Sequence, residues 1–382
     1  MIPRSLWHVA SSALLLGAGL VGVQAAPQEA PGSSPASGPA RACNNSPSLC
    51  GRQYNKITYM GAHDSSFLRD SSTGNSIAGN QFRNATAALE AGLRLLQAQV
   101  HRADAELRLC HSSCGLLDAG PLDAWLTAVA GWMGRNPNEV VTLVLVNADS
   151  APASELQGHF ERSGMAQFGY KPSTAPAATS DWPTLETMIS QGTRLVSFVT
   201  NMEFSPAAPY LLPQFNYVFE TAFEVTQLTG FNCTLDRPAQ MAPASNALSR
   251  GYLSLVNHFK YQNIGGGALR SLTNLVGASS AILVPDVDRI DVTNSPNGDV
   301  DGNLGRHVDQ CRAEWQQQPN FVLVDFWDRQ SPIAAADRLN ALSGTTGRRM
   351  PSPVSAAHSL GASCQGLCGL VVAAVAAAAL LF

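Results

Sequence analysis

Short apolar runs, many of them rich in β-branched residues, recur along the middle of the chain. Continuous apolar runs of this length are typical of the buried strands of a parallel sheet. Helical segments are expected between several of them, for example over 85–91 and 122–133. This alternation predicts an α/β fold, an irregular TIM-type (β/α) barrel in a single domain, with a doubly wound sheet as the alternative. The runs are Ile57 to Met60, Leu93 to Val100, Val140 to Val146, Arg194 to Thr200, Tyr217 to Phe223, Tyr252 to Val256 and Phe321 to Phe326.

The first 25 residues have the layout of a signal peptide. The basic residue Arg4 precedes an apolar run over 13–23, and Val23-Gln24-Ala25 places small residues at the positions that determine cleavage. A membrane-spanning helix is the alternative, but it needs roughly 20 apolar residues, more than this run offers. We therefore expect cleavage near Ala25 and entry into the secretory pathway.

A second apolar stretch, over 367–382, ends the sequence. It carries no charge, and the small residues Ser355, Ala356 and Ala357 precede it across a short polar spacer. This is the layout of a glycosylphosphatidylinositol (GPI) attachment signal, with a short tail-anchor helix as the alternative. We expect a secreted protein, held at the cell surface and GPI-anchored to the plasma membrane.

Composition separates these ends from the body of the chain. Residues 26–42 form a linker rich in Pro, Ser and Ala, and residues 344–366 form a stalk that includes the expected GPI attachment region. Residues 43–343 remain as one barrel domain, in which we interpret Gly265 to Gly267 as a flexible connection. The net charge of -4 and the lack of a basic cluster argue against nucleic acid as a partner. We expect a monomer.

The cysteines also fit an oxidising compartment. Of the eight, six remain once the apolar tail is removed, and an even number suits disulfides. Close spacing favours Cys43 with Cys50 and Cys110 with Cys114, which leaves Cys233 for Cys311, although other pairings stay open. Three glycosylation sequons, at Asn44, Asn84 and Asn232, agree with the same compartment.

Polar residues at the ends of predicted strands are the candidates for chemistry, because parallel sheets and barrels place their sites there. His63 and Asp64 follow the first run, His111 lies in the segment 110–114, and Asp325 follows Val324 within the last run. Two histidines and two carboxylates at one end of a barrel can cleave a phosphodiester by general acid-base catalysis. The alternative for any single histidine is a hydrogen-bonded structural role.

These residues resemble a known family. Gly61-Ala62-His63-Asp64-Ser65, Gly92-Leu93-Arg94-Leu95-Leu96-Gln97-Ala98-Gln99, His111 and Val322-Leu323-Val324-Asp325-Phe326 look like the X-type barrel of phosphatidylinositol-specific phospholipase C, over about Lys56 to Asn340. The resemblance implies that His63 is a general base oriented by Asp325. It implies that His111 is the general acid, with Asp64 as its partner, and that the reaction passes through a cyclic phosphodiester.

One departure from the family concerns charge. Bacterial members carry an arginine on the second strand and calcium-dependent members carry carboxylates, whereas this chain has Gln97 and Gln99. We expect both glutamines to contact substrate, with Asn147 and Asn257 as further contacts to ring hydroxyls. Arg69 or Arg102 is expected to reach in from a loop and supply the positive charge that β-strand residues Gln97 and Gln99 lack. His101 is a weaker candidate for the same role, with a solvated loop histidine as the alternative.

No metal site is expected. Cys110 and Cys114 flank His111, but in an oxidising compartment a disulfide is favoured over a zinc cluster. The acidic region over 286–301 is interpreted as a solvated surface. We expect no cofactor, with calcium left open.

Three functions remain in competition. The first is an extracellular phosphodiesterase that acts on an inositol phospholipid or glycolipid without a metal. The second is an inactive barrel that binds a lipid headgroup or glycan, which the two glutamines favour. The third is a tethered structural protein without a cavity at the His63 end.

Overall fold

All seven predicted apolar runs form strands of one sheet in the computed structural model, which describes residues 41–264 and 283–352. The first, β1, spans only Tyr59–Ala62, and every one of its residues is buried. The other six are β2 (Leu95–Ala103), β5 (Val141–Asn147), β6 (Leu195–Val199), β8 (Val218–Thr221), β10 (Leu253–Asn257) and β13 (Phe321–Val324).

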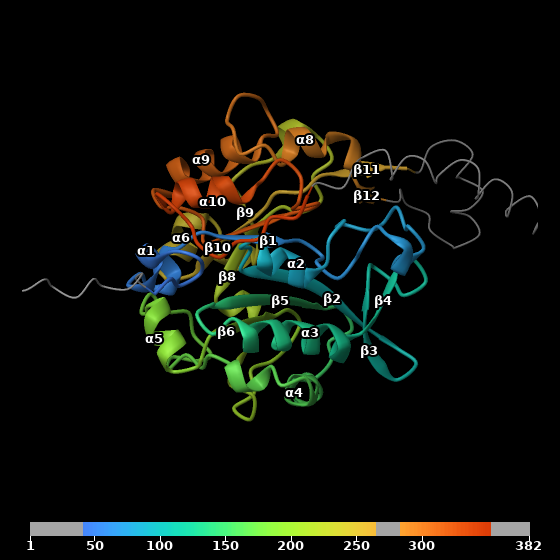
Figure 1. Cartoon of the computed structure of the whole chain (residues 1–382), viewed down its shortest axis with the longest axis vertical. Helices are drawn as coiled ribbons and strands as arrows, with labels where there is room; N and C mark the ends of the chain where they lie inside the picture. The colour runs from blue at the N-terminus through green and yellow to red at the C-terminus, as the bar shows by residue number, and fades with distance from the viewer. Residues whose placement is uncertain (1–40, 265–282, 353–382) are drawn as a thin grey trace, which may run out of the picture. The chain divides into compact units, whose positions relative to one another are not determined.

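The strands follow the order β7-β6-β5-β2-β1-β13-β10-β8-β9. Every neighbouring pair is parallel except β8 and β9 (Leu235–Arg237), which run antiparallel. The sequence did not predict β9 or the short strand β7 (Leu211–Pro213). The result is a curled, mostly parallel sheet, which confirms the irregular barrel (Figure 1).

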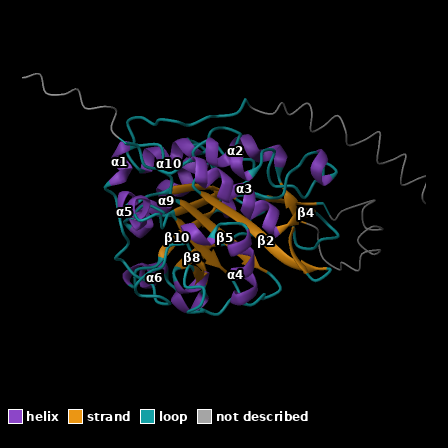
Figure 2. Cartoon of the chain, turned by 60° about the horizontal axis from the view of Figure 1, so that its bottom comes forward, coloured by secondary structure: helices purple, strands orange, loops and turns teal. Residues whose placement is uncertain are grey.

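Helices lie outside the curled sheet (Figure 2). The helix α9 shows why they pack there, because its buried residues Leu304, Val308, Cys311 and Trp315 recur every three or four positions along one face. In the part of the chain that the structure describes, the α-helices are α1 (Pro47–Cys50), α2 (Ala85–Glu90), α3 (Leu122–Arg135), α4 (Ala153–Arg162), α5 (Leu185–Ser190), α6 (Ala244–Ser249), α8 (Ile290–Thr293), α9 (Leu304–Trp315) and α10 (Ile333–Leu339). Among the described residues, no helix is both long and apolar enough to cross a bilayer.

Side chains alternate between the two faces of the sheet, and each face has its own core. On β13, Phe321 and Leu323 belong to the cluster inside the curl, whereas Val322 and Val324 belong to the cluster under the helices. Strand residues two apart share a face. Each strand can therefore carry apolar residues in the interior and a polar residue on the same inward face at its carboxyl end.

Two smaller pairs of strands extend from the barrel. The end of β2 pairs antiparallel with β3 (Glu106–Cys110), which in turn pairs with β4 (Asp118–Pro121). After β10, β11 (Tyr261–Asn263) pairs antiparallel with β12 (Leu283–Pro285).

Three disulfides join cysteines of the described residues: Cys43–Cys50, Cys110–Cys114 and Cys233–Cys311. They are the pairs that the spacing of the cysteines favoured.

Several predicted segments lie outside the described residues. They are the signal peptide 1–25, the linker up to residue 40, Gly265 to Gly267, the stalk beyond residue 352 and the apolar stretch 367–382.

Candidate active site

His63 and Asp325 come together because they follow neighbouring strands. β1 and β13 pair with Ala62 opposite Val324, so the next residue of each strand emerges at the same place. The Nδ1 atom of His63 lies 2.8 Å from Oδ1 of Asp325. The Asn80 amide donates to the same carboxylate oxygen at 3.1 Å. A proton on Nδ1 that donates to this carboxylate leaves Nε2 of His63 with a free lone pair.

Asp64 lies between the two histidines. Its Oδ2 atom is 3.6 Å from Nε2 of His63 and 3.5 Å from Nε2 of His111. Its backbone has a left-handed φ of 44°, which turns the chain sharply after β1. The resemblance assigned Asp64 to His111 alone, whereas the structure places its carboxylate beside both rings.

The two glutamines of β2 hold Asp64. The backbone N–H of Asp64 donates to Oε1 of Gln97 at 2.6 Å, and the Gln99 amide donates to the Asp64 carboxylate at 3.1 Å. Gln99 also accepts a hydrogen bond from the Ser112 backbone at 3.2 Å, next to His111. Gln97 and Gln99 line the cavity, and they also connect the turn after β1 to the loop that carries His111.

His111 is held by the loop after β3. The Cys110–Cys114 disulfide closes this loop, and the His111 backbone N–H donates to Leu117 at 3.0 Å. The ring packs edge-on against Phe67, with 5.2 Å between ring centroids. Its Nε2 atom is buried and makes no hydrogen bond to any described residue. That nitrogen faces the Asp64 carboxylate at 3.5 Å.

The carboxylates and the burial give the two histidines different pKa values. Burial alone would lower the pKa of His63, but the charges of Asp64 and Asp325 outweigh it and raise this pKa. Burial, together with the nearby His63, lowers the pKa of His111 to about 4. Burial raises the pKa of Asp64 to about 6. Perturbed groups of this kind gather at functional sites.

A cavity of about 250 Å³ opens at this end of the barrel. Its lining includes His63, His111 and the predicted Asn257. The Asn257 amide also donates to the Thr221 carbonyl at 2.8 Å, which fixes its orientation.

Asn147 was placed wrongly in the predicted substrate pocket, because it does not line the cavity. On β5, Val144 and Val146 face the cavity, so Asn147 lies on the opposite face of the strand. Its amide is used by the chain, since it donates to the Ala151 carbonyl and accepts from the Ala151 N–H, each at 2.9 Å.

Phe259, Tyr261 and Arg237 line the cavity and were not predicted from the sequence. Phe259 stacks on His63, with 3.5 Å between ring centroids and 6° between planes, and Tyr261 packs against Phe259. Glu220 forms an ion pair with Arg237, and both line the cavity. Glu220 lies two residues after the inward-facing Val218, so its inward direction could be predicted from alternation along the strand. No alternation pattern marks Arg237, because β9 is too short to show one.

Arg69, His101 and Arg102 do not line the cavity, and His101 and Arg102 lie within β2 instead of in a loop. Arg102 pairs through both terminal nitrogens with Glu155, at 2.9 and 2.6 Å. His101 lies 3.6 Å from Asp149. Arg69 is likewise not among the residues that line the cavity.

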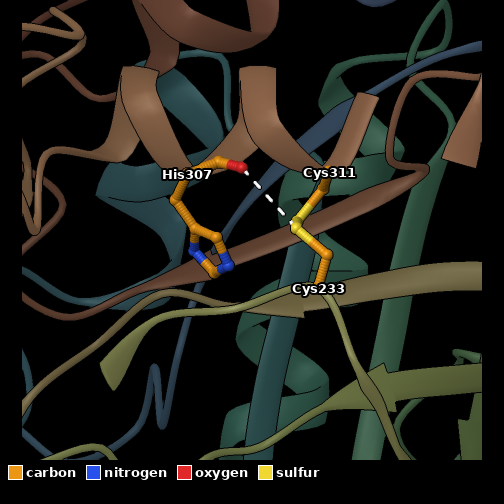
Figure 3. A group of neighbouring side chains, drawn as sticks. All are labelled: Cys233, His307 and Cys311. Atoms are coloured by element: carbon orange, nitrogen blue, oxygen red, sulfur yellow. Dashed lines mark hydrogen bonds between the residues drawn. A yellow bond between two sulfur atoms is a disulfide. The ribbon is translucent and has the colours of Figure 1, made fainter. Parts of the chain in front are cut away.

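One group of three metal-type side chains occurs in the part of the chain that the structure describes: Cys233, His307 and Cys311 (Figure 3). Its two cysteines form a disulfide, so neither offers the thiolate that a metal requires. Nδ1 of His307 faces Nδ1 of His258 at 2.9 Å. We assign this group a structural role.

The predicted solvated surface is wrong for Asp286, which is buried and pairs with Lys260 at 2.5 Å, whereas Asp301 is exposed and pairs with Arg306 at 3.1 Å. These carboxylates are therefore neutralised by side chains of the protein.

Asn44 does not fit the predicted glycosylation. It is buried, and its amide both donates to and accepts from the backbone of Val140, at 3.2 and 2.7 Å. Asn84 and Asn232 are exposed, and their glycosylation stays a prediction.

Comparison with known proteins identifies the family. The family model described as PI-PLC X 1 matches residues 49–340, which include His63, His111 and Asp325. The chain belongs to the PI-PLC X family. This membership and the barrel support a phospholipase C-like phosphodiesterase.

Two relatives from Arthroderma benhamiae are similar to this PI-PLC X chain. PI-PLC X domain-containing protein 1 is 34% identical over 302 residues, which cover 78% of this chain and 90% of the relative. A protein described as an uncharacterized secreted protein is 35% identical over 288 residues, which cover 75% of this chain and 60% of the relative. Among solved structures, the phosphatidylinositol-specific phospholipase C from Listeria monocytogenes matches with a TM-score of 0.44 and 14% identity, covering 76% of this chain and 95% of that one.

Proposed function

We infer that the chain is an extracellular phosphodiesterase that cleaves an inositol phospholipid or glycolipid by general acid-base catalysis without a metal. The observation that carries this inference is the placement of His63 and His111 on one cavity, with Asp64 between them. One imidazole can accept a proton and the other can donate one. The family and the barrel support the same class of reaction.

In the proposed reaction, Nε2 of His63 removes the proton from a headgroup hydroxyl next to the phosphodiester. The hydroxyl oxygen then attacks phosphorus and forms a cyclic phosphodiester, while the bond from phosphorus to the lipid oxygen breaks. Nε2 of His111 donates its proton to that departing oxygen. Asp325 keeps the proton of His63 on Nδ1, and Asp64 stabilises whichever ring is charged.

The second candidate is an inactive barrel that binds a headgroup. Gln97 and Gln99 favour it, because a glutamine donates hydrogen bonds but supplies no positive charge to phosphorus. Their bonds to Asp64 favour the enzyme instead, since they order the acid-base groups.

An assay of purified protein on vesicles separates the two candidates. Phosphatidylinositol and a GPI-anchored protein are offered as substrates, first with a chelator and then with calcium. We expect wild type to release product under both conditions, and His63→Ala to be slower by about 10²- to 10⁴-fold. Equal, negligible release by both proteins from every substrate would leave only the binding function.

We also propose that the protein is secreted and GPI-anchored to the outer membrane surface. The apolar stretch 367–382 and the small residues before it support the anchor. Mass spectrometry of the mature C-terminal peptide tests this, and an intact C-terminus at Phe382 would refute it.

A further inference from the structure

The cavity is acidic, although a phosphodiester substrate is an anion. Glu220 and Glu224 line it, Asp64 lies between the two histidines, and Asp325 contacts His63. Among the described residues that line the cavity, Arg237 is the one lysine or arginine. Within this described lining, an anion that enters the site has no other permanent positive charge to pair with.

We propose that Arg237 binds the phosphodiester anion and supplies, from β9, the positive charge that β2 does not carry. This inference rests on the proposed function, because it concerns the same reaction in the same cavity. It assigns a role to a residue of β9, a strand separate from β2, which carries Gln97, and from β1 and β13, which precede His63 and Asp325.

Strand pairing directs Arg237 toward the cavity. β9 runs antiparallel to β8, and Arg237 lies directly opposite Glu220 in the register. Directly opposed residues of an antiparallel pair point to the same face. Since Glu220 has the inward alternation of Val218, the side chain of Arg237 emerges on the cavity side too.

Three contacts hold the guanidinium in place. A terminal nitrogen pairs with Glu220. The guanidinium carbon lies 4.4 Å from the ring centroid of Phe223 and 5.5 Å from that of Phe215. Such cation-π contacts orient a planar guanidinium at little entropic cost. The charge is therefore positioned before substrate arrives.

Arg237 still has donors to offer a ligand. Among the described residues its Nε atom has no hydrogen-bond partner, although this atom is buried and a ligand must displace neighbouring atoms to reach it. The side chain is 42% exposed, so it can be reached from the open side of the cavity. A guanidinium has five N–H donors in a planar fork that matches the oxygens of a phosphate group.

Glu220 is the matching positioning residue. It is 4% exposed, and burial raises its pKa, an effect that the charge of Arg237 opposes. Its carboxylate also helps raise the pKa of His63. The ion pair therefore links the anion-binding residue to the general base.

The test compares Arg237→Gln with Arg102→Gln on phosphatidylinositol vesicles. Arg102 is a matched control, because its side chain is 41% exposed and pairs with Glu155 away from the cavity. We expect Arg237→Gln to lower kcat/KM by about 10²- to 10³-fold and Arg102→Gln by less than about threefold. Arg237→Lys should lose less activity than Arg237→Gln but should stay below wild type, because a point charge replaces the planar guanidinium.

Two further measurements separate binding from folding. Thermal unfolding of each variant checks that the barrel is intact. Millimolar guanidinium should restore part of the activity of Arg237→Ala and none of that of His63→Ala. If wild type is active and Arg237→Gln stays within about threefold of it, the role of Arg237 is refuted while the proposed function stands. If wild type itself does not exceed His63→Ala, the proposed function fails first.

Discussion

At the scale of single residues, the site is an acid-base pair that shares one carboxylate. Asp64 lies within 3.6 Å of His63 and within 3.5 Å of His111. Its charge favours a proton on either ring. In the free protein the proton resides mainly on His63, because its pKa is raised while that of His111 falls to about 4. A bound phosphodiester anion beside His111 would favour its charged form and prepare it as the acid.

The pKa directions predict a bell-shaped pH dependence of kcat/KM. As pH falls, Asp64 takes up a proton near its raised pKa of about 6, which removes the charge that both histidines need. As pH rises above the raised pKa of His63, which is higher than its ordinary 6.5, the histidine pair loses its last proton. No acid then remains for the departing oxygen, so the rate falls.

Initial rates from about pH 4 to about pH 9 test this for wild type and for Asp64→Asn. The variant should lose the acid limb near pH 6. An acid limb that stays in Asp64→Asn at the same pH would show that another group controls it.

At the scale of elements, alternation along the strands decides which polar residues reach the cavity. On β2, Leu95, Gln97 and Gln99 share the inward face, and on β10 Leu255 and Asn257 do. This rule could be applied to the sequence, and it explains why Gln97 and Asn257 line the cavity, whereas their contact with substrate stays a prediction. Asn147 was predicted badly because strand ends were considered without their faces.

Other elements carried no readable signal. β9 has three residues and runs against its neighbour, so neither period nor length marks it in the sequence. The place of Arg237 at the cavity follows from its register with Glu220, which the sequence does not reveal. The seven strands that follow the predicted apolar runs could be predicted, because each is mostly buried and mostly apolar.

The loop after β3 makes an element-scale prediction. Ser in place of both Cys110 and Cys114 opens a loop of separation 4, which costs only about 1.9 kcal/mol of unfolding free energy in the chain-entropy model. We expect the loss of activity to be larger than this, at about tenfold or more, because His111 loses its fixed position. Urea unfolding and kcat measured on one preparation check both numbers. A variant that is destabilised yet fully active would show that the disulfide does not position His111.

At the scale of the whole molecule, one disulfide joins distant parts of the chain. Cys233 precedes β9, and Cys311 lies in α9, at a separation of 78 residues. The same model assigns this longer loop about 4.5 kcal/mol. The pair also secures the segment that leads into Arg237.

We expect Ser in place of both Cys233 and Cys311 to lower the free energy of unfolding by about 4.5 kcal/mol. Urea unfolding monitored by tryptophan fluorescence measures it, with the Cys110 and Cys114 double variant as the short-loop comparison. A smaller loss for the long loop than for the short one would contradict the assignment.

The central claim is that this barrel cleaves a phosphodiester with His63 as base. Phosphorus NMR of phosphatidylinositol vesicles incubated with the protein tests it most directly, because a cyclic phosphodiester forms only when a headgroup hydroxyl attacks phosphorus. We predict that wild type produces the cyclic signal and that His63→Ala, at equal concentration and shown to be folded, does not. Absence of the signal with wild type, or equal signals from both proteins, would contradict the account.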